Sequence, residues 1–290
     1  MNISVKHFRF KTIKLSLIAI ISGGLFCSCS SHDNVSPEIQ WDKTSINTCI
    51  EQLHMNYEDI YELTCDPSDN VALLSTDYDL LEKLVNLEKI KLVGIGSKDD
   101  AQKFFSELTK LKKLKTVEIV DSHIGSIDKL GDIENMVNLS IAGNIGGGVW
   151  FSIEDIELLG SDERFDELQS LSLKFINLEK IPNLKRLKEL DSLAVSGQEI
   201  TSVDENMVNW DKLTFLEISN TAVSSIDPDV VKQLKKLNSL DISYSKFKDV
   251  YFINELPELE SFKCSGYSTY DVDVECLKKH PNYKDNWLDN

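Results

Sequence analysis

Two carboxylates at matching positions of the sequence are the residues best placed to do chemistry. Glu217 lies in LTFLEI, which begins at Leu213, and Asp241 lies at the same point of LNSLDI, which begins at Leu237. If the two segments form neighbouring parallel strands, the side chains are about 4.8 Å apart. A retaining glycoside hydrolase holds its acid and its nucleophile about 5 Å apart. Glu217 and Asp241 are therefore a candidate catalytic pair.

We expect this pair to be structural rather than catalytic. Side chains on an open sheet have no pocket that would keep one of two carboxyls protonated. The pair is then repulsive, and we expect Lys263 or a bound cation to relieve the repulsion.

Other chemical motifs are incomplete in this chain. GGG at 146–148 is not followed by GK[ST], GxSxG does not occur, and DVDVE at 271–275 lacks the glycine of a calcium loop. His32, His54, His123 and His280 are not at metal or triad spacing from one another. The sequence therefore predicts no catalytic residue, no metal site and no cofactor, and we do not expect an enzyme.

The amino-terminal residues have the features of an export signal. Basic residues stand at positions 6, 9, 11 and 14, and no acidic residue occurs before Asp33. The apolar run from Leu15 to Phe26 is too short, and too one-sidedly flanked by charge, to be a membrane span.

The signal ends in Cys27 and Cys29, each followed by serine. This ending resembles the lipobox of bacterial lipoproteins, although Phe26 stands where that family usually has leucine. The resemblance implies that residues 1–28 are removed and that Cys29 receives lipid, because Ser28 is the small residue such a cut site prefers. The alternative is an ordinary cleaved signal with two discarded cysteines. Residues 29–43 then form a polar tether.

Net charge limits the partners of the chain. The formal charge is −17, and removal of the four basic residues within 1–28 leaves the mature part at −21. Such a chain repels phosphate backbones and anionic lipid headgroups. We therefore expect no nucleic-acid ligand, and contact with a membrane only through the lipid anchor.

One hexapeptide pattern recurs along most of the chain. LxxLxL, with conservative replacements, begins at residues 87, 114, 136, 168, 190, 213, 237 and 259. Most spacings are 22 to 24 residues, within the range of leucine-rich repeats. The pattern resembles leucine-rich repeat proteins, and the 22-residue units resemble the bacterial internalin-like subtype. About eight repeats then cover residues 78–270.

The resemblance implies an α/β solenoid, a right-handed superhelix of leucine-rich repeats. Short parallel strands line its concave face, and 3₁₀ or α segments form its convex face. In this family the third residue after each LxL is an inward polar side chain that satisfies backbone groups at the turn. Here that position holds Ser122, Asn144, Gln198, Thr221 and Ser245, with Ile176 and Tyr267 departing from it.

Two repeats are long, and their extra residues predict additional structure. Ser97 and the apolar spacing after it predict a capped α-helix within residues 97–113. Residues 144–165 form an insertion with three glycines, then Trp150, then a helix-like IEDIELL. Trp150 is either a packing residue or an exposed anchor.

The ends of a solenoid must be capped. Residues 44–77 are expected to form the amino-terminal cap, because Ile46, Ile50 and Ile60 fit one face of a helix over 44–65. Cys49 and Cys65 could tie this cap down by a disulfide. Residues 271–290 are the expected carboxy-terminal cap, where Cys264 either bridges to Cys276 or is simply a small buried hydrophobe.

The repeat pattern also maps the concave face. Outward side chains lie between and beside the inward leucines, and small hydroxyl residues with a few aromatics have the composition of a recognition surface. The alternative for any one of these residues is that it merely solvates the sheet. The candidate ligand-binding residues are Lys91, Glu118, Ser140, Ser172, Lys174, Phe175, Phe215, Glu217, Asp241 and Tyr244.

The sequence thus predicts a lipid-anchored binding protein of the bacterial envelope, at the outer membrane, that holds a protein partner on its concave sheet. The first alternative is a glycan-binding accessory lipoprotein, or a glycoside hydrolase that uses Glu217 and Asp241. A second alternative is a structural spacer without a specific ligand.

Overall fold

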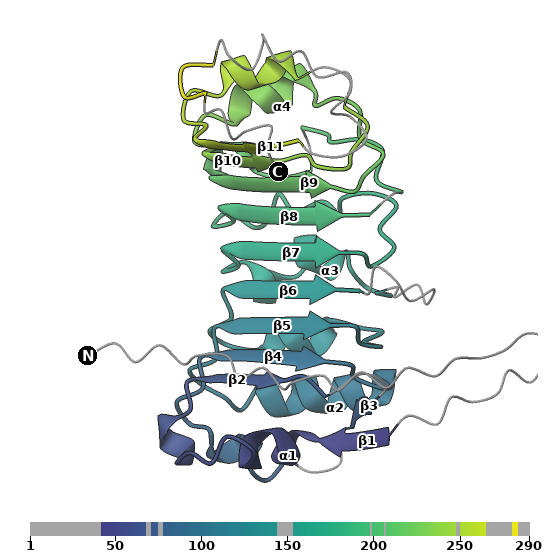
Figure 1. Ribbon diagram of the computed structural model, residues 1–290, viewed down its shortest axis with the longest axis vertical. Coiled ribbons are helices and arrows are strands. Elements are labelled where there is room, and N and C mark those ends of the chain that lie inside the picture. The colour runs from purple at the N-terminus through teal and green to yellow at the C-terminus, as the bar shows by residue number, and fades with distance from the viewer. Residues whose placement is uncertain are drawn as a thin grey trace, which may run out of the picture. The chain divides into compact units, whose positions relative to one another are not determined.

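A computed structural model of the chain (Figure 1) describes residues 42–67, 71–74, 78–143, 153–197, 199–205, 207–247, 250–264 and 280–283. All of these residues belong to one compact unit, Trp41–Asn290. The export signal, Cys29 and most of the expected tether lie outside the described residues.

A parallel sheet of nine strands forms the body of this unit. The strands follow one another without crossover in the order β11-β10-β9-β8-β7-β6-β5-β4-β2, stacked like rungs in Figure 1. This arrangement confirms the expected solenoid. The strands are β2 (Glu62–Cys65), β4 (Lys89–Val93), β5 (Thr116–Val120), β6 (Asn138–Ala142), β7 (Ser170–Lys174), β8 (Ser192–Ser196), β9 (Phe215–Ser219), β10 (Ser239–Asp241) and β11 (Ser261–Lys263).

The register of the sheet aligns equivalent residues of successive repeats. Leu171 pairs with Leu193, which pairs with Leu216, which pairs with Leu240. These four side chains are at most 1% exposed. Burial of one leucine is worth about 1.5–3 kcal/mol, and each leucine here is covered by those of the adjacent repeats. The stack is therefore stable only as a whole.

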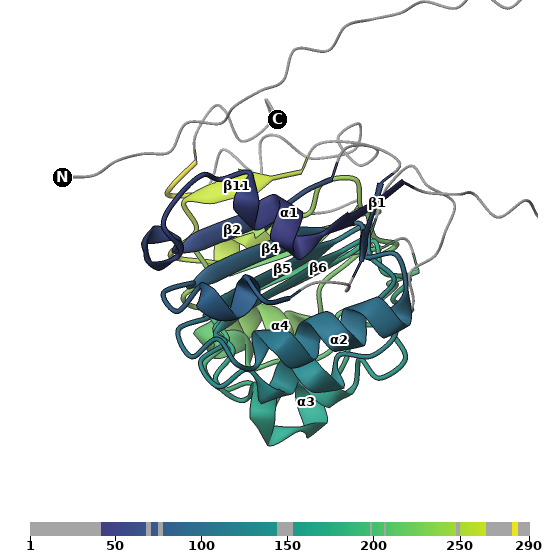
Figure 2. The same ribbon diagram turned by 90° about the horizontal axis from the view of Figure 1, so that it is seen from below.

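Helices and 3₁₀ turns cover the side of the sheet opposite the concave face, as Figure 2 shows for α2, α3 and α4. The predicted cap is present, because the Ser97 hydroxyl accepts a hydrogen bond from the Asp100 amide at 3.1 Å. Phe104 and Phe105 of the following helix are fully buried. The segments are α2 (Lys98–Leu108), α3 (Leu158–Ser161), α4 (Pro228–Gln233), η1 (Tyr57–Asp59), η2 (Leu81–Lys83), η3 (Asp128–Asp132), η4 (Glu163–Phe165), η5 (Trp210–Lys212) and η6 (Tyr251–Glu255).

The amino-terminal end differs from the helical lid expected over residues 44–65. Strand β1 (Asp42–Ser45) pairs with β3 (Val71–Leu74), and helix α1 spans only Ile46–Glu51. Residues 62–65 then join the main sheet as β2. The helical spacing ends because the chain turns at His54, whose φ is 50°, and inward residues then alternate along β2.

A disulfide connects two segments of the amino-terminal end, as the sequence allowed. It links Cys49 of α1 to Cys65 of β2 with a Cα–Cα distance of 5.4 Å. At the other end Cys264 is a free, buried thiol, which agrees with the second of the two alternatives for it. Burial, and secondarily the charge of Asp241, raise the pKa of the Cys264 thiol to about 11. Cys276 lies outside the described residues.

The insertion is described only from Ile153 onward, so Trp150 lies outside the described residues. Its helix is shorter than the helix-like sequence suggested, because only Leu158–Ser161 are α-helical. Asp155 attaches the insertion to an earlier repeat by accepting hydrogen bonds from the Ser126 hydroxyl (2.6 Å) and the Ile127 amide (2.9 Å).

Inward polar side chains occupy the turns on both sides of the middle repeats. Ser122 Oγ accepts a hydrogen bond from the Ile95 amide (3.0 Å), and Ser245 Oγ accepts one from the Thr221 amide (3.2 Å). Ile176, at the same position, is buried and apolar. The expected polar row is therefore interrupted there. Asn144, Gln198 and Tyr267 lie outside the described residues.

Opening the Cys49–Cys65 disulfide is expected to lower the free energy of unfolding by about 3 kcal/mol, because a closed loop of this size restricts the unfolded chain. Denaturant unfolding with and without reductant measures the difference. The double variant Cys49→Ala, Cys65→Ala is the control, and its stability should not respond to reductant. Equal stability of the oxidised and the reduced protein would contradict the prediction.

Candidate functional site

Three parallel columns of outward side chains cover the concave face. The register of the sheet makes each column continuous from repeat to repeat, as the sequence predicted for the central one. The central column consists of Thr64, Lys91, Glu118, Ser140, Ser172, Ala194, Glu217, Asp241 and Lys263. Lys174 belongs to the column toward the strand ends, and Phe215 to the column toward the strand starts.

An ion pair bridges the middle of this face. Lys174 Nζ of β7 lies 2.6 Å from Glu217 Oε2 of β9, and the two side chains are only 29% and 14% exposed. Strand β8 lies between them, and its central outward residue is Ala194, which is small enough for the lysine to pass over. Ala194 is itself only 7% exposed. Lys174 therefore forms a bridge across two strand spacings.

This bridge corrects the expectation that Lys263 relieves the repulsion between Glu217 and Asp241. The register does place those two carboxylates side by side. Glu217, however, pairs with Lys174 and accepts a hydrogen bond from the Ser219 hydroxyl at 2.7 Å. Asp241 accepts one from the Ser243 amide at 2.9 Å. Both carboxylates are thus engaged by neighbouring groups of the sheet and its turns.

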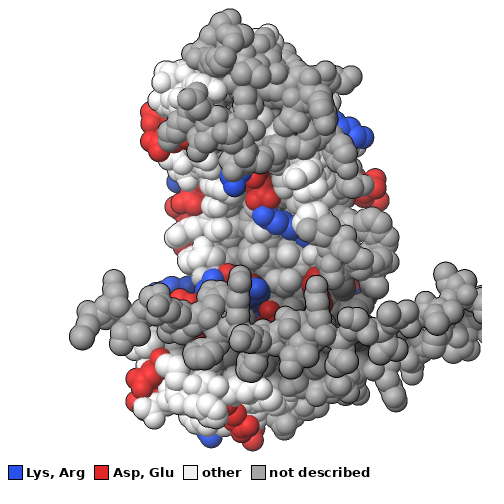
Figure 3. Space-filling view, in the orientation of Figure 1, with Lys and Arg blue, Asp and Glu red and all other residues white. Residues whose placement is uncertain are grey.

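Further ion pairs lie toward the amino-terminal end of this face, and Figure 3 shows basic and acidic residues interspersed on it. Lys89 Nζ lies 2.6 Å from Glu118 Oε1, on the neighbouring strand. Lys115 pairs with Glu88 at 3.0 Å where the strands begin. A partner that docks here would therefore meet both signs of charge within short distances.

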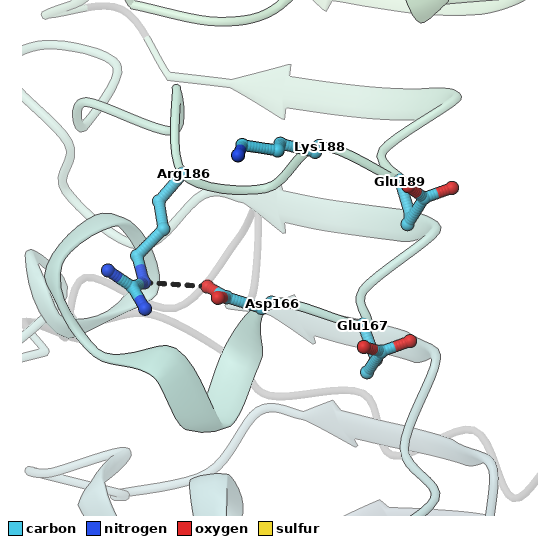
Figure 4. Close-up of a pocket in the computed structure, with 5 residues that line it drawn as sticks. All are labelled: Asp166, Glu167, Arg186, Lys188 and Glu189. Carbon is cyan, nitrogen blue, oxygen red and sulfur yellow. Dashed lines mark ion pairs between the residues drawn. The ribbon is translucent and has the colours of Figure 1, made fainter.

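Two shallow hollows lie at the edge where the strands begin. The first, of about 290 Å³, is lined by charged residues of the loops that enter β7 and β8. Figure 4 shows Asp166 and Arg186 pointing toward each other, and Arg186 Nε lies 2.7 Å from Asp166 Oδ1. Small-molecule sites are mainly apolar and enclosed, so this hollow has little of their character. Its lining residues are Asp166, Glu167, Arg186, Lys188 and Glu189.

The second hollow, of about 330 Å³, lies over the starts of β2, β4, β5 and β6. Its lysines already belong to the ion pairs with Glu118 and Glu88. The lining residues are Tyr61, Glu62, Glu88, Lys89, Lys115, Thr116 and Asn138. In the part of the chain that the structure describes, three or more potential metal ligands do not gather anywhere.

A row of left-handed residues follows the strands, and sequence reasoning missed its conformation. Strands β4, β5, β7 and β9 each end at an outward residue, and the residue directly after it is left-handed. We call these four residues, together with the equivalent residue after β10, the turn row. Their φ angles lie between 49° and 74°. The turn row consists of Gly94, Asp121, Phe175, Asn220 and Tyr244.

Hydrogen bonds between repeats fix the backbone of four of these residues. The amides of Gly94, Asp121, Phe175 and Asn220 each donate to a carbonyl of the next repeat at 2.8–2.9 Å. The left-handed region suits glycine, asparagine and aspartate, whereas a bulky side chain there is an outlier. Such a residue costs about 1–3 kcal/mol of strain. Phe175 and Tyr244 carry this cost.

Burial does not explain the presence of tyrosine in the turn row, since Tyr244 is 51% exposed. A signal for this feature exists in the sequence. Two residues after the last inward residue of each repeat, the chain has glycine, aspartate or asparagine in six repeats and an aromatic in two. Strained residues concentrate at functional sites. Phe175 and Tyr244, already candidates by composition, thus gain a separate structural argument.

Asp121 of the turn row has an electrostatic effect of its own. Burial, and secondarily the charge of Asp66, raise the pKa of the Asp121 carboxyl. Its Oδ1 atom is buried and has no hydrogen-bond partner among the described residues. The protonated, neutral form of the Asp121 carboxyl is therefore more favoured than that of a fully exposed aspartate.

Asparagines at the entrances of the strands form a second ladder that sequence reasoning missed. Asn86 donates to the Glu58 carbonyl (2.8 Å) and Asn135 to the Lys112 carbonyl (2.9 Å). Each reaches back to the preceding repeat. The sequence signal is weak, because an asparagine stands directly before only two of the LxxLxL segments, those that begin at residues 87 and 136. The ladder is structural, because it satisfies carbonyls at the turns.

The largest charge cluster lies on the convex side. The Arg164 guanidinium contacts the carboxylates of Asp128 (2.6 Å), Asp132 (2.7 Å) and Asp162 (2.7 Å). Hydrogen bonds to Arg164 lower the pKa of the Asp162 carboxyl. Arg164 thereby joins η3 to η4, so its role is to connect consecutive convex segments.

Comparisons with known proteins agree with this architecture. No family model matches the chain. Human leucine-rich repeats and immunoglobulin-like domains protein 3 is 25% identical over 151 residues, which are 50% of this chain and 12% of that protein. Bovine leucine-rich repeat-containing G-protein coupled receptor 4 is 32% identical over 86 residues, 30% of this chain and 9% of the receptor. The chain thus spans about a tenth of the length of these relatives.

Solved structures show the same fold. A leucine-rich repeat protein of Leptospira interrogans superposes with a TM-score of 0.53 and 19% identity, over 77% of this chain and 53% of that one. TLR13, in a complex with the RNA ssRNA13, superposes with a TM-score of 0.52 and 17% identity, over 71% of this chain and 29% of that one. The protein is therefore a solenoid with the leucine-rich repeat fold.

The Lys174–Glu217 bridge is expected to be energetically significant. A double-mutant cycle with Lys174→Met and Glu217→Gln should give a coupling of about 1 kcal/mol or more, because both groups are partly buried. Lys112→Met with Glu134→Gln is the matched control, since that pair is 70% and 65% exposed at 3.1 Å. Its coupling should stay below about 0.5 kcal/mol. Equal couplings for the two pairs would refute a role for the bridge.

Replacement of a strained aromatic by glycine is expected to stabilise the fold. Tyr244→Gly should raise the free energy of unfolding by about 1 kcal/mol, because glycine adopts a left-handed backbone without strain. Tyr251→Gly is the control: Tyr251 is 49% exposed but lies in η6 without a positive φ. That change should lower stability. A lower stability of Tyr244→Gly in denaturant unfolding would show that the turn row is unstrained.

Proposed function

We propose that the chain is a binding protein that recognises a protein partner through its concave sheet. The observation that carries this proposal is the continuous outward surface, on which the repeats align polar, charged and aromatic side chains in register. Curved repeat surfaces are suited to extended contacts of this kind. The residues proposed to bind are Lys91, Glu118, Ser140, Ser172, Lys174, Phe175, Phe215, Glu217, Asp241 and Tyr244.

A macromolecular partner fits this surface better than a small ligand. The two hollows are shallow and lined with charge, and they lie at the edge where the strands begin. The carboxylates of the candidate catalytic pair are engaged by Lys174, Ser219 and the Ser243 amide. A surface of this kind binds without reacting, so the proposed role is not enzymatic.

Charge supports protein rather than nucleic acid as the partner. The formal net charge of −17 opposes the approach of a phosphate backbone and favours a partner with basic groups. Partly exposed aromatics among small polar residues, such as Phe215 beside Ser192 and Ser239, are typical of protein recognition surfaces.

The proposed location is the bacterial envelope, with a lipid anchor on Cys29 at the outer membrane. Support comes from the basic and apolar amino-terminal residues and from the lipobox-like FCSCS at 26–30. Within the described residues, no helix has the length and apolar character needed to cross a bilayer. The internalin-like subtype of the repeats is part of this proposal and is supported by the 22-residue units.

Site-specific photo-crosslinking in the producing bacterium tests the proposal. A benzoylphenylalanine at position 215, on the concave face, should form an adduct with another protein, because a docked partner must cover that side chain. The same group at Lys103, an exposed residue of α2 on the convex face, is the matched control. Mass spectrometry identifies the adducts. Adducts from position 103 alone would place binding on the convex side, and no protein adduct from position 215 would overturn the proposal.

A further inference from the structure

The two strained aromatics stand at equivalent points of the repeat, three repeats apart. Phe175 directly follows β7, and Tyr244 lies in the turn after β10. Strands β8 and β9 lie between β7 and β10 in Figure 1. Equivalent residues of stacked repeats point in the same direction. The intervening repeats have Gly197, which is not left-handed, and Asn220 at this position, so no other large side chain stands there between the rings.

The distance between the two positions selects the conformation of a ligand. Three strand spacings of about 4.8 Å separate β7 from β10, which gives about 14 Å. An extended chain rises about 3.4 Å per residue with side chains on alternate faces, so residues four apart share a face at about 13.6 Å. An α-helix rises 1.5 Å per residue, and residues nine apart, at about 13.5 Å, point to opposite sides.

We propose that Phe175 and Tyr244 form a two-point anchor for an extended peptide segment of the partner protein, with apolar side chains four residues apart. The segment lies along the turn row, perpendicular to the strands. This inference rests on the proposed protein-binding function, and it names the part of the partner that the surface recognises. The formal charge of −17 further selects a segment that is basic around its two apolar residues.

The surroundings of the rings fit an extended backbone. Lys174, which precedes Phe175, is tied to Glu217, so the position before the anchor is fixed in the unbound protein. The Phe175 amide donates a hydrogen bond to the Ser196 carbonyl at 2.9 Å, which fixes the backbone from which the ring projects. The side chain of Asn220 is partly exposed between the anchors and offers both a donor and an acceptor to a peptide group.

Strain has a use in this arrangement. The Phe175 backbone, held by its hydrogen bond to the next repeat, has little freedom to lose when a ligand binds. Replacement of Tyr244 by glycine removes the ring while keeping the backbone, so loss of binding and loss of fold can be separated.

An array of synthetic 12-residue peptides tests the anchor. Each peptide carries two leucines three, four, five, seven or eleven residues apart in a background of glycine, serine and lysine. The full-length chain is the probe. Peptides with spacing four should bind at least about tenfold more tightly than those with spacing three or five, because the latter present only one apolar side chain to the rings.

Variants assign this preference to the turn row. Tyr244→Gly and Phe175→Gly should each remove the preference for spacing four, with circular dichroism showing an unchanged fold. Tyr251→Ser, in η6 and outside the proposed binding residues, is the control and should keep the preference, because Tyr251 is similarly exposed at 49% but has no positive φ. Preference for spacing seven or eleven would indicate a helical ligand and overturn the anchor. So would a spacing-four preference that Tyr251→Ser removes and Tyr244→Gly does not.

The anchor and the proposed function can fail separately. If no peptide of the array binds while position 215 still crosslinks to a protein, the anchor is wrong and the concave binding surface stands. If neither experiment detects a protein or peptide ligand, both proposals fall.

Discussion

Hydrogen bonding between parallel strands, repeat after repeat in one register, is the constraint on which the rest of the structure depends. It places each inward leucine over the same leucine of the next repeat and so forms one continuous core. It also places each outward residue in a column. Side chains at one position of the repeat therefore form a continuous column across the sheet. A single repeat has neither this core nor this column.

Hydrogen bonds between repeats also fix the turns. At the turns, the residue types that give the most stable backbone differ from those that give an aromatic surface. A left-handed turn is easily made by Gly94 or Asn220, but Phe175 and Tyr244 adopt it at an energetic cost. Proteins sit only slightly above the stability they need, so strain without benefit tends to be lost. Tyr244 is half exposed and Phe175 partly exposed in such turns, which is consistent with a surface that is optimised for contact rather than for stability.

The sequence predicted the features that repeat along the chain and those that depend on neighbouring residues. The aligned columns follow from periodicity, the Ser97 cap from its neighbours, and the Cys49–Cys65 disulfide from the need to close an end. It missed the Lys174–Glu217 bridge, because two strand spacings and a small residue between them are properties of the assembled sheet. It overestimated the length of the amino-terminal helix, since apolar spacing over 44–65 does not show where the helix ends and a strand begins.

The repeat holds two aromatic residues, Phe175 and Tyr244, in a left-handed backbone. Nuclear magnetic resonance of the isotopically labelled chain tests this conformation through the cross-relaxation between the amide and α protons of one residue. These protons are close together only when φ is positive. The structure predicts strong intraresidue signals at Phe175 and Tyr244, equal to that at Asn220. Weak signals at both aromatics would mean that their turns are unstrained, and would contradict the account.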